Sequence, residues 1–167
     1  HREAAARLGV PFPTSPLRWM EVACDELMGQ ARFGVTFGQG FPVLVGALGP
    51  KMVELGAARS DGLVLNWLTP QHAQETVALA HEIGRANGRT PHTVLYVRLS
   101  PYDALHTDAV NYDAMANYHQ HFQRQGLTSP EDVVAGTCLQ SDDIGHARQQ
   151  LAAWAEAGIE LVCLYPH

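Results

Sequence analysis

The fold of this 167-residue chain is decided by the stretch FPVLVGALGPKMVELGAARSDGLVLNWLTP, residues 41–70. Two apolar runs, residues 41–45 and 62–67, are typical of buried β-strands, and the segment from Lys51 to Arg59 between them favours a short helix. A strand, a helix and a second strand in this order predict a βαβ unit, in which the two strands are parallel.

The turn between the first strand and this helix has a chemical interpretation. Gly49 is expected at the N-cap and Pro50 at the first helical position, where a missing N–H costs nothing. The N-terminus of a helix presents unpaired amide groups and a partial positive charge, so it can bind an anion such as phosphate. Glycine is also common in such turns for steric reasons alone, and these residues by themselves leave both interpretations open.

The rest of the chain continues the alternation of helices and strands. Capping residues followed by proline, Thr69-Pro70 and Ser129-Pro130, predict two helix starts, and residues 141–143 cap the last helix. The predicted helices cover residues 2–8, 17–28, 51–59, 70–87, 102–125 (with a break allowed), 130 onward and 144–157, and the predicted strands cover residues 41–45, 62–67, 93–100 and 159–165. Residues 30–40 are predicted to be irregular. This α/β pattern fits a (β/α) barrel or an open doubly wound sheet.

Composition excludes several classes of protein. The net charge of −6, from 11 Lys and Arg against 17 Asp and Glu, argues against a general binder of nucleic acid or anionic membranes. A hydrophobic content of 46% is typical of a globular protein, and no apolar run approaches the ~20 residues that span a bilayer. The three scattered cysteines, Cys24, Cys138 and Cys163, indicate reduced thiols, and we expect a cytoplasmic protein.

Metal and hydrolase sites are not predicted. His119 and His121 are two residues apart, so on a helix they face different directions, and no HExxH or paired CxxC motif accompanies the nine histidines. A solvated or locally hydrogen-bonded role is expected for them. The chain also lacks the GxSxG motif of many hydrolases.

Two segments, PVLVGALGP (residues 42–50) and DGLVLNWLTP (residues 61–70), resemble the bacterial luciferase-like superfamily, in particular its deazaflavin-dependent oxidoreductases, which are relatives of methylenetetrahydromethanopterin reductase. The resemblance continues through residues 96–98 and from Gly136 to Pro166, and it covers the first forty residues only loosely. It implies a (β/α)8 TIM barrel that holds FMN or the deazaflavin coenzyme F420 at the C-terminal ends of its strands. The predicted strands match strands 5 to 8, so residues 1–167 are expected to be a single domain, the C-terminal half of such a barrel.

The resemblance places the phosphate-bearing part of the cofactor beside the turn that opens the first helix. The cofactor-binding residues implied in this turn are Gly46, Ala47, Leu48, Gly49, Pro50 and Lys51. Lys51 could add a positive charge to a phosphate, or it could simply be solvated in the first turn of the helix.

Asn66 and Arg98 complete the candidate cofactor site. Side chains alternate along a strand, so both residues lie on the face opposite the leucines of their strands, toward the mouth of a barrel. Asn66 could instead bind loop amides. Arg98 needs an anionic partner, which could be the cofactor or an acid of the missing half. Trp67 is expected to pack and not to stack on a cofactor ring.

The function implied is that of a flavin- or deazaflavin-dependent oxidoreductase or monooxygenase, which transfers hydride or activates oxygen on a small organic substrate. A homo-oligomer is expected. The family's usual acid–base residues fall in the missing half, so no catalytic residue is assigned. The alternatives are a non-catalytic cofactor-binding or partner subunit and a sugar-phosphate-binding (β/α) enzyme. Four strands cannot close a barrel, so this half alone is expected to be inactive and to dimerise or aggregate through its open sheet.

Overall fold

The structure, a computed structural model, describes residues 2–33 and 41–166 and consists of two compact units, His1–Val43 and Leu44–His167. The first unit contains helix α1 (Arg2–Arg7) and helix α2 (Pro16–Phe33). Both helices were predicted, but α2 continues to Phe33, so residues 30–33, which were predicted to be irregular, are helical. Residues 34–40 of that segment lie outside the described residues.

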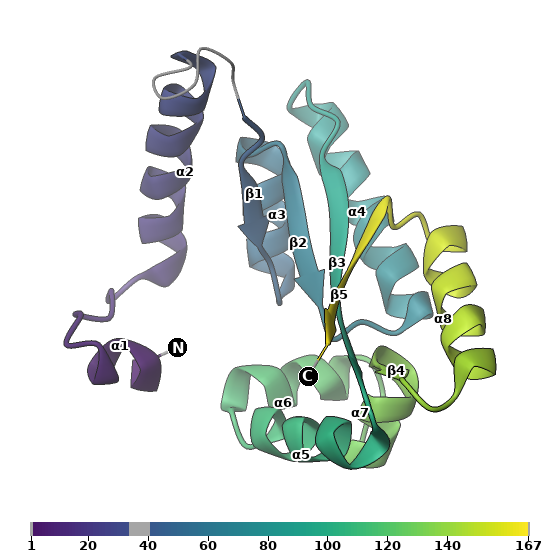
Figure 1. Ribbon diagram of the computed structural model, residues 1–167. Helices are drawn as coiled ribbons and strands as arrows, with labels where there is room; N and C mark the ends of the chain where they lie inside the picture. Colours follow the sequence, from purple (N-terminus) through teal and green to yellow (C-terminus); the bar gives the residue numbers. More distant parts are fainter. Residues whose placement is uncertain (1, 34–40, 167) are drawn as a thin grey trace. The chain divides into compact units, whose positions relative to one another are not determined.

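The second unit is built around a parallel sheet (Figure 1). Its strands are β1 (Leu44–Gly46), β2 (Gly62–Asn66), β3 (His92–Ser100), β4 (Leu139–Gln140) and β5 (Leu161–Pro166). The strands β1, β2 and β3 lie in this order, and β3 also pairs with β5 and, at its end, with β4. Every pair is parallel. The four predicted strands are therefore confirmed, whereas the two-residue β4 was not predicted. The first strand begins at Leu44 and not at Phe41, in keeping with Pro42, which has no amide hydrogen for a ladder.

The described residues of this unit contain six helices, four of which begin at predicted start signals. They are α3 (Pro50–Arg59), α4 (Pro70–Ala86), α5 (Tyr102–Asp113), α6 (Ala116–Arg124), α7 (Pro130–Thr137) and α8 (Ile144–Glu156). The Thr69 hydroxyl accepts a hydrogen bond from the His72 amide at 3.3 Å, and Ser129 forms a capping box with Asp132. The break allowed in the long region 102–125 falls between α5 and α6. None of the helices that the structure describes is long and apolar enough to cross a membrane.

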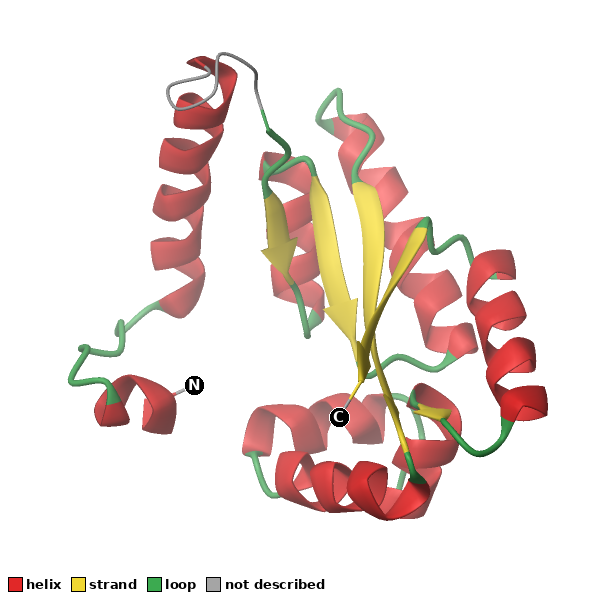
Figure 2. Cartoon of the chain, in the orientation of Figure 1, coloured by secondary structure: helices red, strands yellow, loops and turns green. Residues whose placement is uncertain are grey.

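Two hydrophobic cores hold this unit together. The first lies between the sheet and α3, α4 and α8, where Leu63 and Leu65 of β2 are fully buried, which confirms that helices cover the leucine face. The second joins α5, α6 and α7 around Trp67. Figure 2 shows these three helices together at the end of the sheet toward which the strands run.

Candidate functional site

The turn after β1 leads directly into α3. Gly49 is the N-cap, with an extended backbone (φ −119°) that any residue can adopt, and Pro50 occupies the first turn as predicted. Within the described part of the chain, the amides of Leu48, Gly49 and Lys51 donate to no other residue. The turn therefore presents free hydrogen-bond donors together with the positive end of the α3 dipole.

An inner pocket of about 260 Å³ lies on one side of this turn. It is lined by the turn from Gly46 to Leu48, by Val64 and Asn66 of β2, by Tyr96 of β3 and by Tyr118 of α6. Side chains alternate along β2, and Leu63 and Leu65 face the helices, so this pocket lies on the opposite face of the sheet. Asn66 thus lies where the sequence predicted it.

Two phenol groups give the inner pocket its polar chemistry. Burial raises the pKa of Tyr118, and a hydrogen bond with Asn66 acts in the opposite direction. Burial and the neighbouring Tyr165 raise the pKa of Tyr96, whereas Arg98 lowers it. Both phenols are therefore neutral at pH 7 and can donate a hydrogen bond to a ligand.

An outer pocket of about 180 Å³ lies on the helix side of the same turn. Its lining residues are Ala47, Leu48, Gly49, Pro50 and Val53 around the start of α3, Leu65 and Leu68 at the end of β2, His72, Glu75, Thr76 and Leu79 of α4, and His121 and Arg124 of α6. Leu65 belongs to the helix-covered face, so the sheet separates the two pockets, although Ala47 and Leu48 line both.

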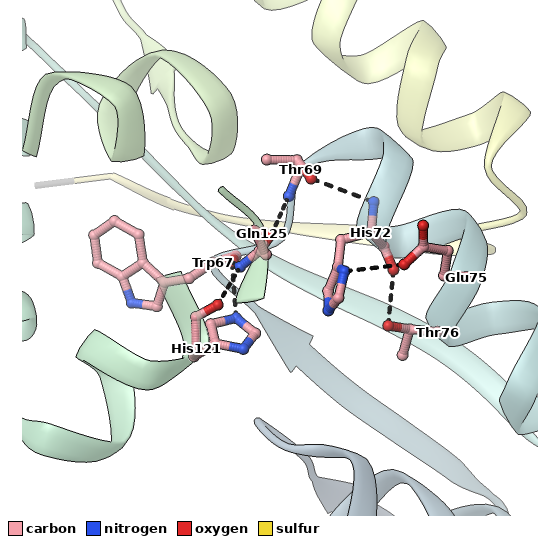
Figure 3. Close-up of polar contacts among 7 residues, drawn as sticks. All are labelled: Trp67, Thr69, His72, Glu75, Thr76, His121 and Gln125. Atoms are coloured by element: carbon pink, nitrogen blue, oxygen red, sulfur yellow. Dashed lines mark hydrogen bonds and ion pairs between the residues drawn. The ribbon is translucent and has the colours of Figure 1, made fainter. Parts of the chain in front are cut away.

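Trp67 connects β2 to α4 in an uncommon conformation. Its φ of 52° lies in the left-handed region, which non-glycine residues rarely adopt. The Trp67 carbonyl accepts hydrogen bonds from His121 Nε2 at 2.9 Å and from Gln125 Nε2 at 2.8 Å (Figure 3). Gln125 also accepts from the Thr69 amide at 2.8 Å. The end of α6 therefore fixes the β2–α4 connection. The Trp67 ring is 2% exposed and packs in the second core, as predicted.

His121 is almost fully buried, with 2% of its surface exposed. A carbonyl can only accept, so Nε2 carries the hydrogen and Nδ1 is a bare lone pair, and Nδ1 has no partner in the described structure. Burial lowers the pKa of His121 to about 4; the bond to Trp67 opposes this, and the nearby Arg124 and His72 add to it. The imidazole is consequently neutral at pH 7.

Arg98 lies on the predicted face of β3 but is covered by α5 and is only 6% exposed. Its Nε donates to Asp108 Oδ2 at 2.9 Å, and its guanidinium carbon lies 4.1 Å from the ring centroid of Trp67 and 4.6 Å from that of Tyr112. The acid predicted to pair with Arg98 thus comes from this chain and not from a missing half. A buried guanidinium needs a carboxylate and can stack on aromatic faces, and α5 supplies the acid and one of the rings.

The structure divides the predicted cofactor-binding residues among several places. Gly46, Ala47, Leu48 and Asn66 line the inner pocket, Gly49 and Pro50 line the outer pocket, Lys51 is exposed at the start of α3, and Arg98 lines neither pocket. Their role in cofactor binding stays a prediction.

Sequence reasoning missed the contribution of α6 to both pockets. Tyr118, His121 and Gln125 follow one another at helical spacing, and this regular polar face is the signal that could have revealed them. His119 points elsewhere and bonds to Asp113 at 2.9 Å. Among the described residues, no three His, Cys, Asp or Glu side chains form a group that could hold a metal ion.

Two solved structures share this arrangement of elements. One is an F420-dependent secondary alcohol dehydrogenase in complex with an F420–acetone adduct, with a TM-score of 0.60 and 16% identity over 78% of this chain and 44% of that chain. The other is the coenzyme F420-dependent tetrahydromethanopterin reductase from Methanopyrus kandleri, with a TM-score of 0.65 and 15% identity over 99% of this chain and 65% of that chain. This chain therefore spans less than two thirds of either protein. No curated protein matches it.

These similarities confirm the predicted fold, in which the parallel sheet and its helices correspond to about half of a luciferase-like (β/α)8 barrel. The model of one protein family, described as luciferase-like monooxygenase, matches residues 29–161, which is most of the sequence. The chain therefore belongs to the luciferase-like monooxygenase family.

Proposed function

We propose that this chain forms part of an oxidoreductase that binds coenzyme F420, or alternatively FMN, in the inner pocket. Membership of the luciferase-like family and the structural similarity to two F420-dependent enzymes support this proposal. The observation that carries it is the inner pocket itself, which lies at the carboxyl ends of parallel strands beside a turn with free amides.

The residues of the inner pocket fit such a cofactor. A Cβ added to Gly46 would meet no atom within 4 Å, so there is open space beside the turn. The amides of Leu48, Gly49 and Lys51 would hold the phosphate, and Asn66 offers an amide to a polar ring edge. When bound, F420 or flavin supplies the hydride chemistry, and the protein orients it and limits the access of water.

Arg98 and Lys51 have more distant roles in this proposal. Arg98 stacks on the ring of Trp67, the residue that follows Asn66, and would in this way help to position Asn66. Lys51, exposed in the first turn of α3, adds a positive charge near the cofactor phosphate.

A variant that occupies the inner pocket tests this proposal. Gly46 pairs with Val64 in the parallel ladder, so valine suits its backbone, and Gly46→Val should leave the unfolding midpoint nearly unchanged. Its side chain would occupy the cofactor space, and the dissociation constants of F420 and FMN, measured by fluorescence titration, should rise at least tenfold. Thr76→Val in the outer pocket is the matched control. Unchanged cofactor affinity in Gly46→Val would contradict the site.

Turnover separates an enzyme from a non-catalytic binding subunit. With F420 bound, we expect a secondary alcohol or another small hydride donor to bleach the absorbance of the oxidised coenzyme. Binding without bleaching across a panel of such donors would favour the non-catalytic alternative. We also propose that residues 1–167 act as a single domain that associates with further copies or strands, which light scattering on the isolated chain would test.

A further inference from the structure

The outer pocket contains groups that the proposed cofactor does not use. Leu65 lines it from the helix-covered face of β2, whereas Val64 and Asn66 line the inner pocket from the other face. A ligand in the outer pocket would therefore contact the far side of the turn after β1. The side chains of Arg124, His121 and Glu75 around this pocket indicate the chemistry of such a ligand.

The first group is a guanidinium beside the start of α3. Arg124 Nη2 lies 3.6 Å from the position that a Cβ on Gly49 would occupy. Within the described residues Arg124 has no acidic partner. A free guanidinium next to the positive end of a ten-residue helix attracts a carboxylate or another oxyanion.

The second group is the open nitrogen of His121. Its Nε2 donates to the Trp67 carbonyl, and His121 is one of the residues that line the outer pocket. This buried Nδ1 has no partner and carries a lone pair. It can only be satisfied by a ligand that donates a hydrogen, such as an ammonium or a hydroxyl group.

The third group is a carboxylate on α4. Glu75 Oε2 lies 3.2 Å from His72 Nδ1, and both side chains line the pocket (Figure 3). A negative charge here opposes a simple anion but stabilises a ligand that also carries a positive group. The remaining walls are aliphatic, from Val53, Leu65 and three further leucines, and would enclose a short hydrocarbon side chain.

We propose that the outer pocket binds a small aliphatic α-amino acid. Its carboxylate would bind Arg124, its ammonium group would donate to His121 Nδ1 and face Glu75, and its side chain would pack on the leucines. The pocket volume of about 180 Å³ suits a ligand of the size of valine. The proposal does not depend on the identity of the cofactor, because no cofactor group takes part in it.

Three probes of nearly equal shape test the charge pattern on the full-length protein by isothermal titration calorimetry. L-Valine carries both charges, 3-methylbutanoate lacks the ammonium group, and 2-methylpropylamine lacks the carboxylate. Hydrogen bonds that involve charged groups contribute about tenfold or more each, so valine should bind at least tenfold more tightly than either analogue.

Exposed variants give the test a signature that a merely structural role would not produce. Glu75→Gln should weaken the binding of valine but strengthen that of 3-methylbutanoate, because it removes both an attraction for ammonium and a repulsion of carboxylate. Arg124→Gln should weaken both carboxylates and should not weaken the amine, because it also removes a repulsion of the ammonium group. Arg148→Gln, an exposed change of the same charge on α8, should alter none of the three affinities.

His121→Gln tests the buried nitrogen. A glutamine amide can keep the donor to the Trp67 carbonyl while removing the Nδ1 acceptor, so the preference for valine over 3-methylbutanoate should shrink about fivefold. If this variant fails to fold, Glu75→Gln and Arg124→Gln still test whether the outer pocket binds an amino acid. The proposal is overturned if 3-methylbutanoate binds as tightly as valine, if the amine alone does so, if no probe binds, or if Arg124→Gln changes nothing.

Discussion

The regions on the two sides of Trp67 each bury one basic side chain, and they differ in how completely it is satisfied. Arg98 stacks on the indole ring and has a carboxylate partner in Asp108. His121 bonds to the carbonyl of the same residue and keeps one nitrogen without a partner. A buried polar group whose needs are met within the chain stabilises the fold, whereas one left half-satisfied marks a place where a ligand can bind.

The largest expected effect on stability comes from replacing Arg98, the basic side chain whose partners all lie within the chain. Arg98→Met removes the ion pair with the partly buried Asp108 and two cation–π contacts, so the free energy of unfolding should fall by about 3–5 kcal/mol. Urea denaturation measures this loss. Arg98→Lys, which keeps the charge but not the planar stacking, should lose less. A loss below about 1 kcal/mol in Arg98→Met would mean that Arg98 is as loosely held as a surface residue.

Lowering the pH should decrease the stability of the protein through the protonation of His121. The pKa of His121 is lowered to about 4, so the unfolded chain binds its proton at a higher pH than the folded protein does. Stability is therefore full above pH 6.5 and is lost as the pH falls toward 4. The gap between these values, at about 1.4 kcal/mol per pH unit, bounds the loss at about 3 kcal/mol. Unfolding curves between pH 7 and 4 measure it, and His121→Gln should flatten the profile. Equal slopes in both proteins would exclude His121 as the source.

A smaller effect is expected from the bridge between α6 and the β2–α4 connection. Gln125→Leu removes a donor to the Trp67 carbonyl and the acceptor of the Thr69 amide, so stability should fall by about 2 kcal/mol. The effect should appear as faster amide exchange at Thr69 in NMR spectra. Gln123→Leu, an exposed neighbour on the same helix, is the control. Unchanged exchange at Thr69 would show that the bridge does not hold the connection.

The smallest effect concerns the indole nitrogen. Trp67 Nε1 is buried and has no partner among the described residues, so Trp67→Phe relieves an unsatisfied donor while leaving a small cavity. The two contributions oppose each other, and the unfolding free energy should change by less than about 1 kcal/mol. Thermal melts with a paired Trp154→Phe control, whose Nε1 does donate to the Leu68 carbonyl at 2.9 Å, should show a clear loss only in the control.

The parts of this molecule that the sequence predicted are those whose signals are local. The caps at Gly49, Thr69 and Ser129 stand next to the helices they begin, and the alternation in β2 lies within five residues. The position of Asn66 at the end of its strand followed from the same pattern, whereas Gly46, which was expected in the turn, is the last residue of β1.

What escaped prediction depends on pairs of residues distant in sequence. His121 and the Trp67 carbonyl are 54 positions apart, and nothing in either segment indicates the other. The partner of Arg98 lies on the next helix, and its identity depends on the angle at which α5 covers β3. The two-residue β4 carries too short a pattern to be distinguished from a turn.

The pairing of the sheet also implies an order of events as the chain folds. Strands β1 and β2 align Leu44 with Gly62 across a short connection, and β2 and β3 are joined by one helix. Strand β5 must instead align its Leu161 with Val94 of β3, and the whole segment from α5 to α8 lies between these two strands in the sequence. Closing a longer loop costs more chain entropy and slows folding, so β1 to β3 with α3 and α4 should form the nucleus, and β5 should dock last. During synthesis on the ribosome, the edge of β3 would thus stay open until the residues of β5 emerge.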